Sequence, residues 1–244
     1  MLDRLSGKIV IWNGDSICAG KGFDDTKELD AWAGRIAAQH PGMIYKNYAV
    51  GGGTVSENSP AFSSGKRRHS VSETLDLMYE EYPNADYVLI EGGTNDADLF
   101  EEGGMPERIG STDVTDFSGN YDRDTFCGAL ESIFYRATKY WKGKKIAYIV
   151  AHKMGAGRAG FTAELNGRRA YFEQAIAICK KWGIPYLDLW ERCYLNPKLP
   201  WMFDKTLDGM GNAAAGSLYA DGQHLTSAGY DLTASIIDAW LMTL

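Results

Sequence analysis

Three side chains in this sequence, Ser16, Asp221 and His224, are of the types that carry out nucleophilic acyl transfer. A serine hydroxyl is a poor nucleophile until a base removes its proton, and a histidine that titrates near neutrality can be that base. Asp221 stands three residues before His224, and in a helical turn this spacing places the carboxylate beside the imidazole. There it fixes the tautomer and stabilises the imidazolium. The sequence therefore predicts Ser16 as nucleophile, His224 as base and Asp221 as the partner of His224.

The oxyanion that forms during acyl transfer also needs hydrogen-bond donors that are already in position. The backbone N–H of Ser16, the backbone N–H of Gly52 and the side-chain amide of Asn95 are three candidates. A glycine at position 52 lets the backbone approach a substrate closely. Taken singly, Ser16 fits a helix cap and Asn95 fits a turn former. Their combination with His224 favours an active site.

The elements that must position these residues alternate between strands and helices. Short apolar runs predict strands at residues 8–12, 44–50, 87–91, 145–151 and 185–189. Helical periodicity predicts helices at 31–39, 72–81, 122–141, 162–182 and 226–241, the last with Thr226 or Ser227 as its N-cap. Continuous apolarity indicates strands covered on both faces, as in a parallel sheet. The pattern predicts one doubly wound α/β domain over residues 1–244.

Polar segments follow the first three predicted strands, and ligands of such sheets bind beyond the carboxyl ends of the strands. We therefore expect GDS at 14–16, NYAVGG at 47–52 and GTND at 93–96 to meet at one edge. DGQH at 221–224 comes just before the last predicted helix. The irregular stretches 99–119 and 190–222 are long enough to be functional or mobile loops.

These four segments, in this order and over nearly the whole chain, resemble the blocks of the SGNH hydrolases, the GDSL-type esterase and lipase superfamily. Ile17 stands where leucine is common. The resemblance implies a three-layer, flavodoxin-like α/β/α sandwich with a five-stranded parallel sheet. It also implies a serine esterase with the triad Ser16, Asp221 and His224, the oxyanion donors Ser16, Gly52 and Asn95, and neither cofactor nor metal. The long loops cannot be aligned to any one subfamily.

The substrate is the least determined feature. Aromatic residues precede the DGQH block, where they would stack on a sugar ring, hold an acyl chain or cover a core edge: Trp190, Tyr194, Trp201 and Phe203. No long apolar lid is present, which argues against a triglyceride lipase. We expect a small-molecule substrate, a short-chain (acetyl) ester of a polar or carbohydrate alcohol. A thioesterase or lysophospholipase on the same scaffold, and an inactive binding module, are the alternatives.

Two glycine-rich segments resemble nucleotide-binding motifs, but their spacing is wrong. A phosphate loop requires GxxxxGK followed by Ser or Thr, whereas the glycine after Gly14 stands one position too late and Gly22 follows Lys21. The segment GAGRAG at 155–160 is separated from its strand by three residues. The next acidic strand residue, Asp188, lies beyond the expected spacing of about 20 residues. The loop at 153–161 is better interpreted as a mobile segment over the active site.

Other polar residues near these segments have structural interpretations. Asp15 is expected to brace the turn, and Asp96 either orients the oxyanion loop or is a solvated carboxylate. His152 follows a strand and either lines the pocket or is structural. Structural or solvated roles are expected for His40 and His69, and a solvated loop face for Asp98, Glu101 and Glu102.

Composition excludes several classes of protein. The 244 residues carry a net charge of −7, with a single short basic run at 66–69, which argues against a nucleic-acid partner. The four cysteines are widely spaced and predict buried free thiols. No apolar run reaches the 18 or more residues that read as a membrane span, and no signal peptide is visible. The sequence as written predicts a cytoplasmic protein, although removal of a secretion signal would leave the same sequence.

Overall fold

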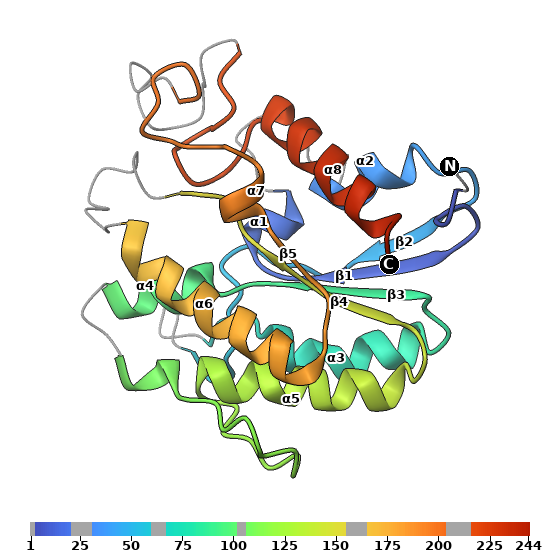
Figure 1. The fold of residues 1–244 in the computed structure, drawn as a ribbon, viewed down its shortest axis with the longest axis vertical. Coiled ribbons are helices and arrows are strands. Elements are labelled where there is room, and N and C mark those ends of the chain that lie inside the picture. Colours follow the sequence, from blue (N-terminus) through green and yellow to red (C-terminus); the bar gives the residue numbers. More distant parts are fainter. Residues whose placement is uncertain (1–2, 21–30, 60–66, 102–105, 155–164, 204–215) are drawn as a thin grey trace.

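Five parallel strands form one sheet in the order β2-β1-β3-β4-β5 (Figure 1). The computed structural model describes residues 3–20, 31–59, 67–101, 106–154, 165–203 and 216–244. The strands are β1 (Ile9–Asn13), β2 (Ile44–Asn47), β3 (Tyr87–Glu91), β4 (Lys145–Val150) and β5 (Tyr186–Asp188). All four strand pairs are parallel. This order confirms the flavodoxin-like arrangement.

Burial distinguishes the central strands from the edge. All five residues of β3, YVLIE, are buried, and β1 and β4 are buried except at their first residues. Helices on both faces explain why these strands are continuously apolar. The prediction of a strand covered on both faces is wrong for β2, whose residues alternate between exposed and half-buried. β2 pairs with β1 alone at the edge of the sheet, so its side chains are less covered.

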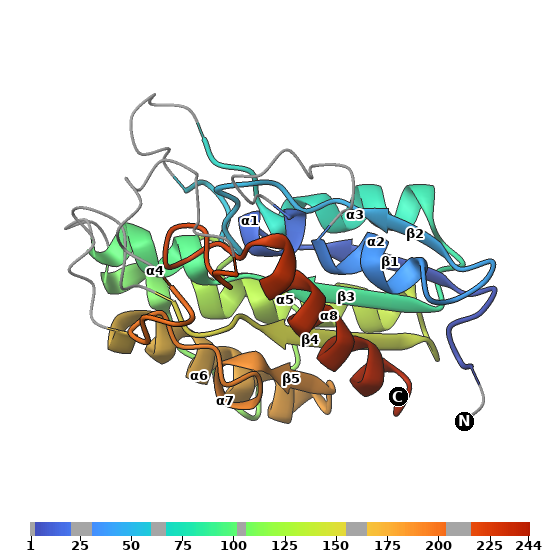
Figure 2. The ribbon, with the colours of Figure 1, turned by 90° about the horizontal axis from the view of Figure 1, so that it is seen from above.

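Helices cover both faces of the sheet, which confirms the three-layer α/β/α sandwich. On one face, α2 (Ala31–Ala37) packs against α8 (Ser227–Leu241). On the other, α5 (Phe126–Tyr140) packs against both α3 (Val71–Glu81) and α6 (Leu165–Trp182) (Figures 1 and 2). The two layers enclose a continuous apolar core.

Side-chain caps explain where several helices begin. Thr226 accepts the backbone N–H of Gly229 at 3.3 Å, so the predicted N-cap of the last helix is confirmed. Thr125 accepts the N–H of Gly128 at 3.1 Å. The predicted helix at 122–141 therefore starts only at Phe126, because a capping threonine has extended rather than helical backbone angles.

Short helices occur where sequence analysis predicts none. α1 (Ser16–Ala19) follows β1, and α4 (Thr94–Glu101) follows β3, so the predicted irregular stretch 99–119 begins inside a helix. η1 (Pro106–Ile109) adds a single 3₁₀ turn, and α7 (Leu189–Arg192) occupies the start of the stretch 190–222. Gly92 and Gly93, at φ +151° and +106°, turn the chain sharply from β3 into α4.

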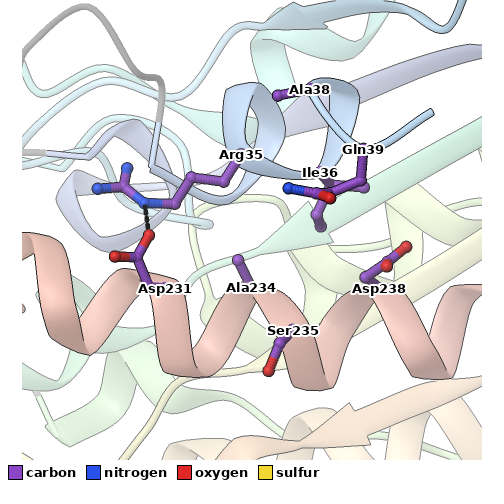
Figure 3. Close-up of a pocket in the computed structure, with 8 residues that line it drawn as sticks. All are labelled: Arg35, Ile36, Ala38, Gln39, Asp231, Ala234, Ser235 and Asp238. Atoms are coloured by element: carbon purple, nitrogen blue, oxygen red, sulfur yellow. Dashed lines mark hydrogen bonds and ion pairs between the residues drawn. The ribbon is translucent and has the colours of Figure 1, made fainter. Parts of the chain in front are cut away.

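A cavity of about 520 Å³ lies between α2 and α8, lined by residues of both helices (Figure 3). Arg35 reaches across it to Asp231, with Nε 2.7 Å from Oδ1. None of the predicted site residues lines this cavity. The four cysteines are buried free thiols, as predicted. Among the described helices, none is long and apolar enough to span a membrane.

Candidate active site

Ser16 is the first residue of α1, directly after the turn at Gly14 and Asp15 that follows β1. Asp15 is the N-cap of α1, and its carboxylate accepts the Ile17 N–H at 2.8 Å, so Asp15 braces the turn as expected. Gly14 is required here by close packing: a Cβ at this position would lie 2.5 Å from Glu91 Oε2. Ser16 lies at the carboxyl end of β1 and is buried, with 5% of its surface exposed.

Hydrogen bonds join Ser16, His224 and Asp221 into one chain. Nε2 of His224 lies 2.9 Å from the Ser16 Oγ, although the residues are 208 positions apart. Nδ1 of His224 lies 2.8 Å from Asp221 Oδ2. In Figures 1 and 2, α1, α4 and the segment that enters α8 lie at the same end of the sheet. The predicted meeting of these residues is therefore observed.

The segment around Asp221 is not the helical turn that sequence analysis assumes. It consists of bends closed by an antiparallel bridge between Tyr219 and Leu225. Asp221 Oδ1 accepts the N–H groups of Gln223 at 2.9 Å and His224 at 2.7 Å, while Oδ2 faces the imidazole. These hydrogen bonds to the Asp221 carboxylate fix the loop and place the carboxylate beside the imidazole without a helical turn.

The electrostatics keep Asp221 ionised. Burial by itself raises the pKa of this carboxyl. The hydrogen bond and charge of His224, together with the backbone N–H groups of His224 and Gln223, outweigh burial and hold the pKa below its ordinary value. An ionised carboxylate that accepts from Nδ1 directs the lone pair of Nε2 toward Ser16.

The candidate oxyanion segment is tied to both neighbouring loops. The Val50 N–H donates to the Gly14 carbonyl at 3.2 Å, and the Asn95 amide donates to the Gly53 carbonyl at 2.8 Å. Gly52 lies between these links at φ +79°, and no atom of the described residues lies within 4 Å of where its Cβ would be. Arg68, itself buried, donates to the Gly52 carbonyl at 2.9 Å. The structure thus brings Ser16, Gly52 and Asn95 to one edge.

Asp96 orients the loop that follows this segment, rather than pointing into solvent. Its carboxylate accepts the N–H groups of Val55 at 2.8 Å and Ser56 at 3.0 Å, and the Ser56 hydroxyl at 2.6 Å. Burial raises the pKa of Asp96 despite these bonds, which favour the charged form. Of the two sequence interpretations, the structure selects orientation of the loop.

His152 contacts the loop that carries Asp221 and His224. Its ring is fully buried, and Nε2 lies 2.8 Å from the Gln223 carbonyl, between Asp221 and His224 in sequence. Burial lowers the pKa of His152 to about 4, so its ring is neutral and Nε2–H donates to that carbonyl. From the sequence, His152 either lines the pocket or is structural, and the structure gives it a structural contact. Its position after β4 was the only signal, and it did not reveal the contact with residue 223.

The remaining sequence candidates separate into structural and exposed groups. His40 bridges Asp3 and Asp238 at 2.8 and 2.7 Å, and His69 contacts Thr74, so both have structural partners. Among the aromatics, two are buried and two exposed: Trp190 and Phe203, against Tyr194 and Trp201. Residues 155–160 and the side chains of Asp98, Glu101 and Glu102 lie outside the described part of the structure.

Comparison with known proteins identifies the family. The model of the GDSL-like lipase/acylhydrolase family matches residues 13–232, from the last residue of β1 into α8. No curated protein matches the chain. Among solved structures, a protein from Lactobacillus plantarum is 22% identical with TM-score 0.66, covering 98% of both chains. A carbohydrate acetylesterase from Sinorhizobium meliloti (14% identity, TM-score 0.62) and an aryl esterase from M. smegmatis (13%, 0.64) each cover 97% of this chain and 99% of their own.

These likenesses show a shared fold, and the match over most of the chain confirms the resemblance that the four sequence blocks indicate. This protein therefore belongs to the GDSL-like lipase/acylhydrolase family and is a carboxylic ester hydrolase.

Proposed function

We propose that this protein hydrolyses short-chain esters of a polar or carbohydrate alcohol through an acyl-enzyme formed on Ser16. The observation that carries the proposal is the hydrogen-bonded chain from Asp221 through His224 to Ser16, with distances of 2.8 and 2.9 Å. A nucleophile, a base and an oriented carboxylate in contact are the geometric requirements of nucleophilic acyl transfer. We further propose that residues 1–244 act as one SGNH-hydrolase-like domain.

In the first half-reaction, Ser16 Oγ attacks the ester carbonyl while Nε2 of His224 accepts the hydroxyl proton. The C–O bond to the alcohol then breaks, and His224 returns the proton to the departing oxygen. In the second half-reaction, His224 accepts a proton from water, which attacks the acyl-enzyme and releases the acid. Asp221 keeps the imidazole in the required tautomer throughout.

The developing oxyanion is stabilised by the N–H groups of Ser16 and Gly52 and by the Asn95 amide. The Asn95 amide has two protons, and its bond to the Gly53 carbonyl uses one of them. Arg68 holds the carbonyl of Gly52, which leaves that residue's peptide in a defined orientation. These contacts support a donor set that is in place before the substrate binds.

A carbohydrate carrier is supported by an exposed tryptophan close to the catalytic loop. Trp201 is 72% exposed, and the carbonyl of the next residue, Met202, accepts the N–H of Leu218 at 2.8 Å and the Ser217 hydroxyl at 3.1 Å. Ser217 and Leu218 lead directly to Asp221. Exposed aromatic rings are suitable platforms for the apolar faces of sugars. The carbohydrate acetylesterase among the structural relatives supports the same substrate class.

The esterase mechanism is tested by hydrolysis of p-nitrophenyl esters from acetate to decanoate, with wild type and Ser16→Ala. We expect wild-type activity to be highest with acetate and Ser16→Ala to lose it. Equal rates for the two proteins would reject the mechanism. A preference for long acyl chains would instead support the thioesterase or lysophospholipase alternative. An inactive wild type would support the binding module.

The carrier is tested with Trp201→Ala, using acetylated xylo-oligosaccharides and p-nitrophenyl acetate side by side. We expect KM to rise for the sugar ester alone, since stacking on one aromatic ring is lost while the chemistry is unchanged. Leu77→Ala, an exposed apolar residue on α3, is the matched control and should change neither KM. Equal behaviour of Trp201→Ala and wild type on the sugar ester would remove this part of the proposal.

A further inference from the structure

Two acidic side chains lie buried together beneath the nucleophile turn. Asp15 is 0% exposed and Glu91, the last residue of β3, is 1% exposed. Glu91 Oε2 accepts the Asp15 backbone N–H at 3.1 Å, which places the two carboxyl groups next to each other. No lysine, arginine or histidine of the described residues forms an ion pair with Glu91. Two adjacent buried carboxylates cannot both stay charged at low energy.

The surrounding tyrosine hydroxyl groups donate their hydrogens to backbone carbonyls, so they do not donate to either carboxyl group. Tyr148 on β4 donates its hydroxyl hydrogen to the Gly92 carbonyl at 2.6 Å. Tyr230 on α8 donates its hydrogen to the Ile17 carbonyl at 2.9 Å. Two adjacent buried carboxyl groups favour a state in which one of them is protonated. Backbone N–H groups donate to both, from Ile17 to Asp15 and from Asp15 to Glu91, so burial of Glu91 beside the charge of Asp15 is what favours the proton on Glu91.

We propose that Glu91, as a neutral carboxylic acid, is a positioning residue that holds the Gly14–Asp15 turn and thereby the nucleophile Ser16. It accepts the N–H of Asp15 and fills the space that the missing Cβ of Gly14 leaves open. As a neutral acid it is also able to donate to the adjacent Asp15 carboxylate. The proposal rests on Ser16 being the nucleophile, as argued above, and assigns Glu91 no contact with substrate.

The electrostatic surroundings agree with a neutral Glu91. Burial first, and then the negative charge of Asp15, raise the pKa of Glu91 well above its ordinary value of 4.5. Among the described residues, the hydroxyls of Tyr148 and Tyr230 also interact with Glu91, and their pKa values are raised as well, mainly by burial. None of these groups offers a positive charge. As the pH rises through the pKa of Glu91, two carboxylates would face each other beneath Ser16 and force the turn apart.

The experiment measures the nucleophile directly, as the rate at which a fluorophosphonate labels Ser16 at a series of pH values. Wild type should lose labelling rate reversibly at alkaline pH as Glu91 ionises. Glu91→Gln keeps a neutral donor and acceptor of the same shape, so it should label within a few-fold of wild type near neutrality and lack the alkaline loss. Glu91→Met has neither group and should label roughly ten- to a hundredfold more slowly, because a bond to a charged group is lost.

Two control variants, Glu80→Gln and Ser16→Ala, separate the possible outcomes. Glu80→Gln, an exposed residue on α3, should keep the wild-type profile. If Glu91→Met does not fold, the pH profile of Glu91→Gln still decides. An alkaline loss in Glu91→Gln equal to that of wild type, or a folded Glu91→Met that labels like wild type, would overturn the positioning role. Ser16→Ala must resist labelling: if it does not, the proposed nucleophile is wrong, whatever Glu91 does.

Discussion

Replacing Asp221 by asparagine is expected to inactivate the enzyme by imposing the wrong tautomer on His224. In the native loop, Oδ1 accepts the N–H groups of Gln223 and His224, and Oδ2 accepts Nδ1–H of the imidazole. An asparagine has one oxygen and one NH₂ group. If its oxygen keeps both backbone bonds, the NH₂ group donates to Nδ1. The ring proton then moves to Nε2, which can no longer accept the proton of Ser16.

The size of the effect follows from the opposite orientation of the asparagine. Turning the oxygen toward His224 restores the correct tautomer but aims the NH₂ group at two backbone N–H groups. Each buried donor left without an acceptor costs about 1–3 kcal/mol, hence about 2–6 kcal/mol for the pair. The productive orientation is then populated roughly 30-fold to 10⁴-fold less than the unproductive one, and kcat should fall by a similar factor.

The assay is steady-state hydrolysis of p-nitrophenyl acetate, with thermal unfolding by circular dichroism to confirm the fold. ¹⁵N NMR of the imidazole should show the proton on Nδ1 in wild type and on Nε2 in Asp221→Asn. Asp221→Ala is the matched comparison, because it leaves His224 free to choose its tautomer, and it should be at least as active as Asp221→Asn. A folded Asp221→Asn with more than about a tenth of wild-type kcat would refute the tautomer argument.

Three further predictions test other parts of the site and the fold. Asn95→Ala should lower kcat for p-nitrophenyl acetate by about 10²–10³-fold, and a loss below tenfold would exclude Asn95 as an oxyanion donor. Because burial lowers the pKa of His152 from 6.5 to about 4, the unfolded chain binds more protons in this window. The free energy of unfolding should therefore fall by up to about 3 kcal/mol as pH drops from about 6.5 to 4. Urea titrations at a series of pH values should show that the free energy of unfolding depends less steeply on pH in His152→Gln than in wild type. An unchanged pH dependence would assign the effect to another group. Lys181→Met should lower the free energy of unfolding by about 3–5 kcal/mol, because Lys181 and Glu131 pair at 2.7 Å and are 1% and 2% exposed. In urea titrations, the double variant Lys181→Met with Glu131→Leu should regain part of the lost free energy of unfolding. Equal stability of Lys181→Met and wild type would contradict the argument.

The strands and main helices were predictable because their signals are local. Buried strands such as β3 consist of runs of Val, Ile, Leu and Tyr, and helices such as α5 have one apolar face. Boundaries were less well predicted where a single side chain decides them. Thr125 shortens α5 by capping it, and Gly92 and Gly93 turn the chain into α4 at once. The exposure of β2 depends on its place at the edge, which no local pattern encodes.

The candidate triad was predictable because the residue types and their order already limit the chemistry. The sequence by itself determined a serine, a histidine and an aspartate at the ends of predicted elements, together with the glycine and asparagine that accompany them. Only the tertiary structure decided that His224 reaches Ser16 across 208 residues, because that contact depends on how the sheet is ordered. It also decided which backbone groups Glu91, Asp96 and His152 bind. Their contribution lies in backbone groups they bind from distant segments, and hydrogen bonds to a partner's backbone leave no mark in the partner's residue type.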